Sequence, residues 1–242
     1  MRYLIKFEKK GMMIYISHLD TQRLFHRTMK RAELSLKYSS GFNPHPKLSF
    51  AQPLSLGHSS ISEYAEFEAG DPPMQPGEIK ERLNRLLPEG FKVVEAWTLP
   101  PDARPAAAQV GAAKYHLEIP FFFSYMTAIM EFFGNESIIV QKKHKKTGRV
   151  EDKNIRPQII NLKPVLVDNS TIMLTASLHC GSASNLNPEA MLESFYRCSR
   201  RAYDRNTVKI ERVALLGWAK DELLPLEYLC HGFIPQQQMQ HP

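Results

Sequence analysis

Hydrophobic and polar positions alternate along the first residues of the chain and then change to a helical spacing. Residues 2–8 follow a period of two, which is typical of a half-buried strand. Residues 17–20 have the form of a capping box, a hydroxyl followed three residues later by an acid, and predict a helix from there to about Leu36. Four apolar residues at helical spacing should face the core, namely Phe25, Met29, Ala32 and Leu36.

Short strand patterns and one further helix fill the rest of the first hundred residues. Strands are expected over 47–50, 63–69 and 91–98, and a helix between Pro76 and Pro88. The order is therefore strand, helix, strand, strand, helix, strand, as in a ferredoxin-like βαββαβ module. A looser version of this order recurs in the second half of the chain, with an extra strand and a basic insertion.

These patterns predict an α+β fold of two tandem ferredoxin-like modules, whose antiparallel sheets carry their helices on one face. The first module should span residues 1–100 and the second 112–229, joined by a proline- and alanine-rich linker at 101–111. The tail from 230 to 242 has little apolar surface, and we expect it to be flexible. The strand at 63–69 should have one solvated face, which carries Tyr64.

Composition narrows the class of protein. Hydrophobic residues make up 43% of the 242 residues, so a packed core is expected. No run of 18 apolar residues occurs, and we expect a cytoplasmic protein without a membrane partner. The three cysteines are widely spaced, which argues against a disulfide framework or an iron–sulfur site. Phosphate-loop, dinucleotide and nucleophile-elbow motifs are absent, so no cofactor is expected.

Positive charge is concentrated in two blocks. Residues 1–50 contain ten Lys/Arg and three Asp/Glu, a net charge of +7, and residues 140–165 contain eight against two, a net charge of +6. The whole chain has a net charge of only +6. Such clustering is typical of a surface that binds a polyanion, although a solvated basic surface would give the same count.

The segment from Tyr38 to Lys47, which reads YSSGFNPHPK, is the most unusual in the chain. Its two prolines stiffen the loop and remove backbone donors, so the backbone that carries His45 should have little conformational freedom. Tyr38 and Phe42 are candidate platforms for base stacking. A purely structural interpretation, in which Phe42 fills the core and the prolines set a tight connection, stays open.

We therefore expect RNA to bind along the early helix, the proline-rich loop and a basic hairpin tip. The candidate RNA-binding residues are Arg23, Arg27, Lys30, Arg31, Tyr38, Phe42, Asn43, His45, Lys47, Lys142, Lys143, Lys145, Lys146 and Arg149. Should the protein be an enzyme, it would cleave RNA without a metal by acid–base chemistry or modify RNA, and His18, His45 and Lys47 are the candidate catalytic residues.

The histidines leave other arrangements open. His18 is expected to pair with Asp20, to meet His45 across the fold, or to act only as a residue of the capping turn. A metal site built from His18, His26 and His45 is conceivable, but no paired-ligand spacing supports it, and we expect no metal.

Together these residues resemble a known bacterial family. The strings SHLD at 17–20, GFNPHPK at 41–47 and PLSLG at 53–57, with the basic residues between them, resemble the radical-SAM-linked protein family. The resemblance is strong over residues 1–70 and corresponds to the freestanding form. It implies a radical SAM protein as partner and a link to tRNA, rRNA or ribosome metabolism, with no assigned reaction. The chain lacks the CxxxCxxC of a radical SAM enzyme, so an accessory role or that of a protein adaptor without RNA contact is implied.

Overall fold

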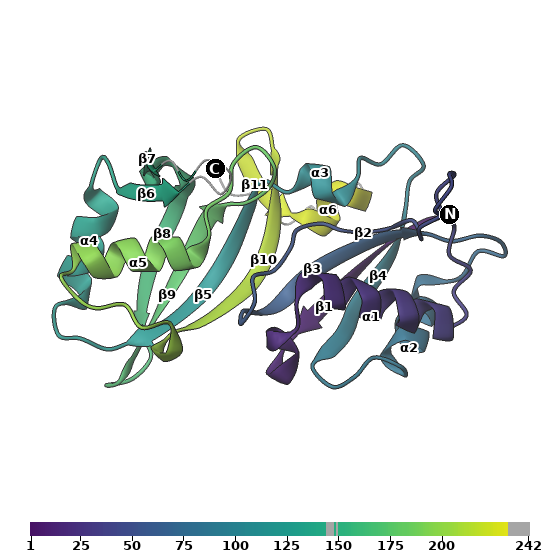
Figure 1. The fold of residues 1–242 in the computed structure, drawn as a ribbon, viewed down its shortest axis with the longest axis horizontal. Coiled ribbons are helices and arrows are strands. Elements are labelled where there is room, and N and C mark those ends of the chain that lie inside the picture. Colours follow the sequence, from purple (N-terminus) through teal and green to yellow (C-terminus); the bar gives the residue numbers. More distant parts are fainter. Residues whose placement is uncertain (144–147, 149, 232–242) are drawn as a thin grey trace, which may run out of the picture. The chain divides into compact units, whose positions relative to one another are not determined.

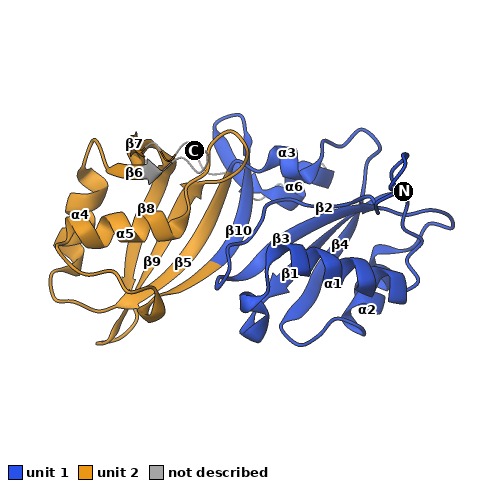
Figure 2. Cartoon of the chain, in the orientation of Figure 1, with its two compact units in different colours: residues 1–111, 212–242 blue, residues 112–211 orange. Residues whose placement is uncertain are grey.

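The computed structural model describes residues 1–143, 148 and 150–231, drawn as a ribbon in Figure 1. The chain divides into two compact units (Figure 2). Unit 1 comprises residues 1–111 and 212–242, and unit 2 comprises residues 112–211. Within the described residues, no helix combines the length and the apolar character needed to cross a bilayer.

Unit 1 alternates strands and helices in the predicted order and adds a C-terminal segment. In chain order its elements are β1 (Arg2–Lys9), the 3-10 helix η1 (Gly11–Tyr15), α1 (His18–Arg31), β2 (Leu48–Phe50), β3 (Ser59–Glu68), α2 (Pro76–Asn84), β4 (Phe91–Leu99), α3 (Ala106–Gln109), the greater part of β10 (Lys209–Ala219), β11 (Glu222–Pro225) and α6 (Leu226–His231). β1 lies between β3 and β4 and is antiparallel to both, and β2 pairs antiparallel with β3.

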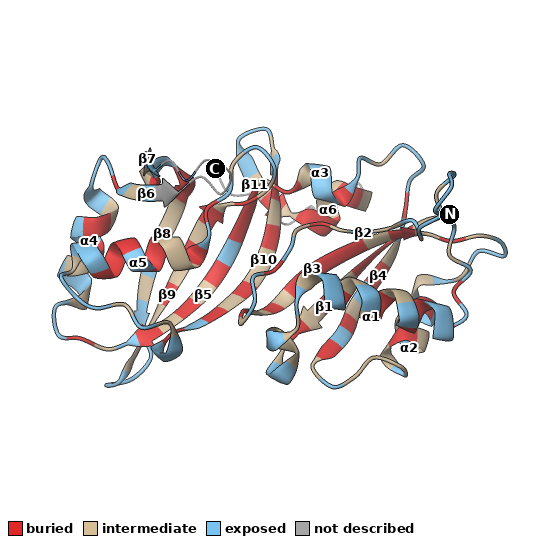
Figure 3. Ribbon diagram, viewed as in Figure 1, coloured by how far each residue is buried: buried red, intermediate tan, exposed pale blue. Residues whose placement is uncertain are grey.

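The hydrophobic core of unit 1 lies between the sheet and the helices α1 and α2. Because side chains alternate along a strand, Tyr3, Ile5 and Phe7 all point to this face. Phe25 and Met29 of α1 are fully buried against them, and the Phe7 and Phe25 ring centroids are 4.6 Å apart. Figure 3 shows the buried strands beneath an exposed outer side of α1. The predicted core stripe of this helix is therefore confirmed, with Leu36 partly buried beyond the helix end.

The opposite face of the same sheet is covered by α3 and α6, which corrects the expectation that helices lie on one face. Lys6 of β1 forms an ion pair with Glu227 of α6 at 3.0 Å. The hydroxyl of Tyr64 in β3 donates a short hydrogen bond to the same carboxylate. Tyr64 is therefore buried and not on a solvated face as predicted, because the C-terminal segment covers it.

One buried ion pair ties β10 to β3 within unit 1. The Arg212 guanidinium donates to Glu63 through Nε at 2.7 Å and through a second nitrogen at 2.5 Å, and both residues are almost completely buried. Arg212 also donates to the carbonyl oxygens of Gln52 and Pro53. These bonds occupy the guanidinium and so offset much of the cost of burying its charge.

Unit 2 consists of two antiparallel sheets and two longer helices. Its elements are β5 (Ala112–Pro120), α4 (Tyr125–Gly134), β6 (Ile139–Lys143), β7 (Val150–Asn154), η2 (Arg156–Gln158), β8 (Ile159–Leu166), β9 (Thr171–His179), α5 (Pro188–Cys198), η3 (Arg205–Thr207) and the start of β10. β9 lies between β5 and β8, and β6 pairs with β7. Phe132 of α4 and Phe195 of α5 pack edge to face in its core.

The α+β class with antiparallel sheets is confirmed, whereas two tandem ferredoxin-like modules stay a prediction. The domain limits differ at the C-terminal end, because residues from Arg212 onward belong to unit 1 and not to a second module that ends at 229. The linker at 101–111 contains α3, whose Ala106 amide donates to Glu66. Cys230 is buried in α6 and so is not part of a flexible tail, and residues 232–242 lie outside the described residues.

Replacing Arg212 by methionine should destabilise unit 1, because the Glu63 carboxylate would stay buried without its cation. We expect the free energy of unfolding, measured by urea denaturation of the full chain, to fall by about 3–5 kcal/mol. The matched control is Arg85→Ala, which removes an exposed ion pair with Glu81 at 3.8 Å and should cost less than about 1 kcal/mol. Equal losses for the two variants would contradict this role of the buried pair.

Candidate nucleic-acid interface

Three arginines form a row on the exposed side of α1. Arg23, Arg27 and Arg31 are spaced by four residues, so successive members lie about one helical turn apart, roughly 6 Å along the axis. They line a groove of about 660 Å³ whose apolar lining includes Leu24, Leu86 and other residues of unit 1. The predicted exposure of the basic residues of this helix, Lys30 included, is confirmed.

The charges of this arginine row are largely uncompensated. Arg23 forms an exposed ion pair with Asp20 at 3.2 Å, and Asp20 is also hydrogen-bonded to Ser17, the N-cap residue. Ser17 thus caps the helix as predicted, because its hydroxyl accepts from the Asp20 amide; the Asp20 carboxylate accepts from this hydroxyl and not from the Ser17 amide of a full capping box. In the described part of the chain, Arg27 and Arg31 have no ion-pair partner, so their guanidinium groups are available to an anion.

The loop from Tyr38 to Lys47 is closed at its base and exposed at its tip. The Ser39 amide donates to the His45 carbonyl oxygen at 2.8 Å, and the His45 amide donates to the Ser39 hydroxyl at 3.0 Å. Gly41 has a φ of 147°, a conformation that favours glycine. Next to it, Phe42 is fully exposed, and Asn43 and His45 are exposed as well. The interpretation that Phe42 fills the core is therefore wrong.

A small pocket of about 250 Å³ lies between this loop and α1. It is lined by Leu19, Gln22, Arg23, His26, His45, Pro46, Leu48 and Phe50. The arginine row and the imidazole of the loop, both predicted from the sequence, are thus neighbours, since Arg23 and His45 line the same pocket. Sequence reasoning missed Leu19 and Gln22, although Leu19, Gln22, Arg23 and His26 recur at the spacing of one helical face.

His26 carries an unsatisfied polar atom at this pocket. Its Nε2 is closed to solvent and has no hydrogen-bond partner among the described residues. Leaving a buried polar atom unpaired costs about 1–3 kcal/mol, so such atoms are uncommon in folded proteins. One nitrogen of this imidazole is therefore unsatisfied, and it is closed to the pocket as well as to bulk solvent.

Lys47 and Tyr38 occupy different environments at the base of the loop. The Lys47 ammonium contacts both carboxylate oxygens of Glu68, at 3.0 and 3.1 Å. It is therefore already neutralised in part, and it does not line the small pocket beside His45. Tyr38 is 47% exposed, so its ring can still meet a ligand.

Among the described residues, His18 has no hydrogen bond or ion pair with its predicted partners Asp20 and His45. Its Nε2 is 3.1 Å from the Gln22 side-chain nitrogen, and its ring packs edge to face against Phe50. Burial lowers the pKa of His18 below its ordinary value; Lys9 and Arg212 add to the lowering, although the Glu63 carboxylate opposes it. A neutral imidazole is therefore favoured near pH 7.

A buried polar cluster beneath the start of α1 was not predicted from the sequence. It consists of Lys9, Glu63 and Arg212, each almost completely buried. The Lys9 ammonium donates to the Ile16 carbonyl oxygen at 2.9 Å, and burial lowers the pKa of Lys9. Because Glu63 and Arg212 are 149 positions apart in the chain, no local pattern could have joined them.

The second basic block lies in unit 2 and is only partly described. β6 and β7 pair antiparallel from Ile139 with Asn154 to Lys143 with Val150, which confirms the predicted hairpin. Lys145, Lys146 and Arg149 lie outside the described residues, and of Lys142 and Lys143 only the backbone is described. Their proposed contact with RNA stays a prediction.

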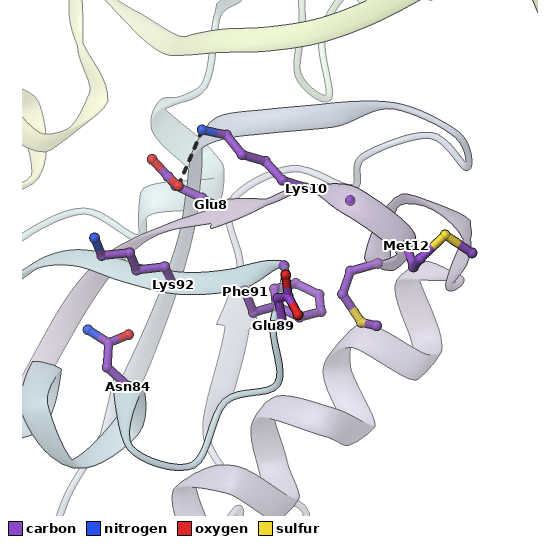
Figure 4. Close-up of a pocket in the computed structure, with 10 residues that line it drawn as sticks. Glu8, Lys10, Met12, Asn84, Glu89, Phe91 and Lys92 are labelled. Atoms are coloured by element: carbon purple, nitrogen blue, oxygen red, sulfur yellow. Dashed lines mark ion pairs between the residues drawn. The ribbon is translucent and has the colours of Figure 1, made fainter.

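A larger cavity of about 820 Å³ in unit 1 is lined by charges of both signs. Figure 4 shows Glu8 and Lys10 forming an ion pair above Lys92 and Asn84. The Asn84 amide is already bonded to the Val93 backbone. None of the residues predicted from the sequence lines this cavity, and its mixed charges do not favour a polyanion. Across the described residues, no three His, Cys, Asp or Glu side chains cluster as metal ligands.

Fold and surface together define an α+β protein that carries an exposed arginine row beside a hydrogen-bonded loop with an exposed phenylalanine. The chain matches the family described as "Uncharacterized protein conserved in bacteria (DUF2344)" over residues 2–188, and it belongs to that family.

Two solved structures show only distant likeness. A chain of a Cbf5-Nop10-Gar1 complex is 7% identical with a TM-score of 0.47, and the match covers 87% of this chain and 47% of that one. This chain thus spans about half the length of the chain it matches. An unknown protein from Galdieria sulphuraria is 10% identical with a TM-score of 0.25, over 87% and 96% of the two chains. No curated protein matches the sequence.

The depressed pKa of His18 can be measured directly. In a proton NMR titration, the His18 ring should titrate below about 6.5, the ordinary value for histidine. Because the unfolded chain would bind the proton more readily, the free energy of unfolding should decrease as the pH falls through this range, and less so in His18→Gln. A midpoint at or above the ordinary value would contradict the burial of this ring.

Proposed function

We propose that this protein is an RNA-binding accessory protein that works with a radical SAM enzyme in tRNA or rRNA modification or in ribosome metabolism. One observation carries the RNA-binding part of the proposal. The arginine row of α1 lies beside a closed loop that exposes Phe42 and His45, and Arg23 and His45 line one pocket.

The electrostatics of α1 favour a polyanionic ligand. Arg27, Lys30 and Arg31 are exposed, and the described residues offer them no ion-pair partner, so phosphate groups would meet cations that are not already neutralised. Arginine forms bidentate hydrogen bonds with phosphate oxygens, which gives both affinity and orientation. A row of such groups along one helix suits a backbone that presents regularly spaced phosphates.

The exposed aromatic side chain favours a nucleic acid over a simple anion. A fully exposed phenylalanine has no structural role in the core, and its hydration is unfavourable. Bases of single-stranded RNA stack on such rings, whereas phosphate or sulfate would gain nothing from them. RNA is therefore the ligand that would use both features, because its phosphates would bind the cations and its bases would stack on the exposed ring.

The radical SAM partner rests on the sequence resemblance. The string GFNPHPK at 41–47 resembles the radical-SAM-linked protein family, and this resemblance implies a cobalamin-binding radical SAM protein as partner. A role as an adaptor that contacts this partner without RNA is the alternative. Purification from cells at low salt, followed by identification of crosslinked RNA and protein, distinguishes the two roles, because an adaptor would be recovered with the enzyme alone.

Replacing Arg23, Arg27 and Arg31 together by glutamine should weaken RNA binding without unfolding unit 1, since all three side chains are exposed. Removing one arginine–phosphate interaction should reduce the slope of log affinity against log salt by about 0.7–1, so the slope should fall by roughly 2–3 in the triple variant. Fluorescence anisotropy with a labelled RNA at several salt concentrations measures both effects.

The control for this experiment is Arg82→Gln with Arg85→Gln on α2 and its C-cap. These arginines form ion pairs with Glu78 and Glu81, and they should contribute little to RNA binding. Absent RNA binding, or an affinity that does not depend on salt, would remove the proposed function.

A second candidate is metal-independent cleavage or modification of RNA, for which the exposed His45 in the pocket beside α1 is the candidate acid–base group. Prolonged incubation of RNA with the purified protein and a chelator tests it. If turnover occurs, it should be lost in His45→Ala and retained in His18→Gln, since His18 does not line this pocket. Intact RNA, or turnover that survives His45→Ala, would exclude this activity.

A further inference from the structure

We infer that the small pocket between α1 and the 38–47 loop receives one unstacked base of single-stranded RNA, while Phe42 stacks on a neighbouring base. This inference rests on the proposed function and narrows it to a class of RNA and a mode of recognition. In this mode of recognition, His45 and Phe42 contact the bases of the RNA. The arginine row contacts only its phosphate backbone.

The lining of the pocket suits the two faces and the edge of a heterocycle. Leu48, Phe50 and Pro46 are half-buried and provide apolar contact area. Polar groups come from Gln22 and Arg23 on the helix and from His45 on the loop. Largely apolar walls with a few convergent polar groups are typical of sites for small organic ligands, and unstacked bases are held in this way.

The size of the pocket favours a small ligand or one small group of a larger ligand. At about 250 Å³, the pocket is smaller than the range of about 300–1,000 Å³ that encloses drug-sized molecules and cofactors. One ring system with its hydrogen-bonding edge is the ligand that this volume favours. A duplex would keep its bases stacked and could offer only phosphates to the neighbouring groove.

The loop is prepared for stacking before any ligand binds. Hydrogen bonds between Ser39 and His45 close its base, so the His45 ring is presented with little remaining backbone freedom. Phe42 projects from the tip and contacts solvent on all sides. A preorganised platform loses little conformational entropy when a base stacks on it, which favours binding.

Arg23 connects the base pocket with the backbone groove. It lines both cavities, and Arg27 and Arg31 continue only along the larger one. An RNA strand with a phosphate near Arg23 can therefore place the attached base beside His45, while its phosphate backbone continues along α1.

The test compares three RNAs of equal length in anisotropy titrations: a single-stranded oligouridine, an abasic ribose–phosphate oligomer, and a duplex. Wild-type protein should bind the oligouridine about tenfold more tightly than the abasic oligomer, because each stacked base contributes to affinity. His45→Ala and Phe42→Ala should each lose most of this preference and leave affinity for the abasic oligomer unchanged. Phe123→Ala is the matched control, since that phenylalanine of unit 2 is also exposed.

The outcomes of this test show whether base recognition fails alone or together with the proposed RNA binding. If no RNA binds, both fail. Equal affinity for the oligouridine and the abasic oligomer, tighter binding of the duplex, or unchanged base preference in His45→Ala and Phe42→Ala overturns base recognition and leaves salt-dependent RNA binding in place. Because Phe42 and His45 are exposed, circular dichroism should show both variants folded, so a loss of preference cannot come from unfolding.

Discussion

The burial of Phe25 and Met29 against β1 determines which side chains α1 presents to solvent. A helix can bury only one stripe, so fixing these two residues in the core turns the arginine row outward. Phe25 also packs edge to face against Phe50, whose ring in turn lines the small pocket. One aromatic cluster therefore orients the helix and shapes the pocket, and any change in its packing would move both parts of the candidate site.

Local patterns predicted the start of α1 but not its end. Ser17 is the N-cap that its spacing from Asp20 indicated, and its hydroxyl accepts from the Asp20 amide. The helix ends at Arg31 because Glu33 adopts a left-handed conformation with a φ of 57°, and the Leu34 amide donates back to the Met29 carbonyl oxygen. Glycine usually marks such an end. Glutamate does not indicate a helix end, so the sequence pattern predicts a helix that continues past Glu33 to about Leu36.

Long-range contacts account for the other differences. The expectation that Tyr64 is solvated failed because Glu227, far along the chain, lies over it and pairs with Lys6. The neutralisation of Lys47 by Glu68 is likewise a contact between two segments that sequence spacing treats separately. For the candidate site, residue types and their placement on helix or loop were predictable. Tertiary ion pairs determine which cations stay without a partner, and these pairs can be identified only once the folded structure is known.

The division of cations into paired and unpaired sets has a consequence for specificity. Lys47 and Arg23 form ion pairs with Glu68 and Asp20, whereas Arg27 and Arg31 have no such partner in the described part of the chain. Positive charge that is free therefore increases along α1, away from the pocket that His45 lines. In the proposed mode of binding, Arg27 and Arg31 attract the phosphate backbone of the RNA to the C-terminal end of α1. Contacts with bases at the pocket beside Arg23 then determine which RNA is preferred. Such a separation would make affinity sensitive to salt and selectivity sensitive to strandedness, because the two depend on different side chains.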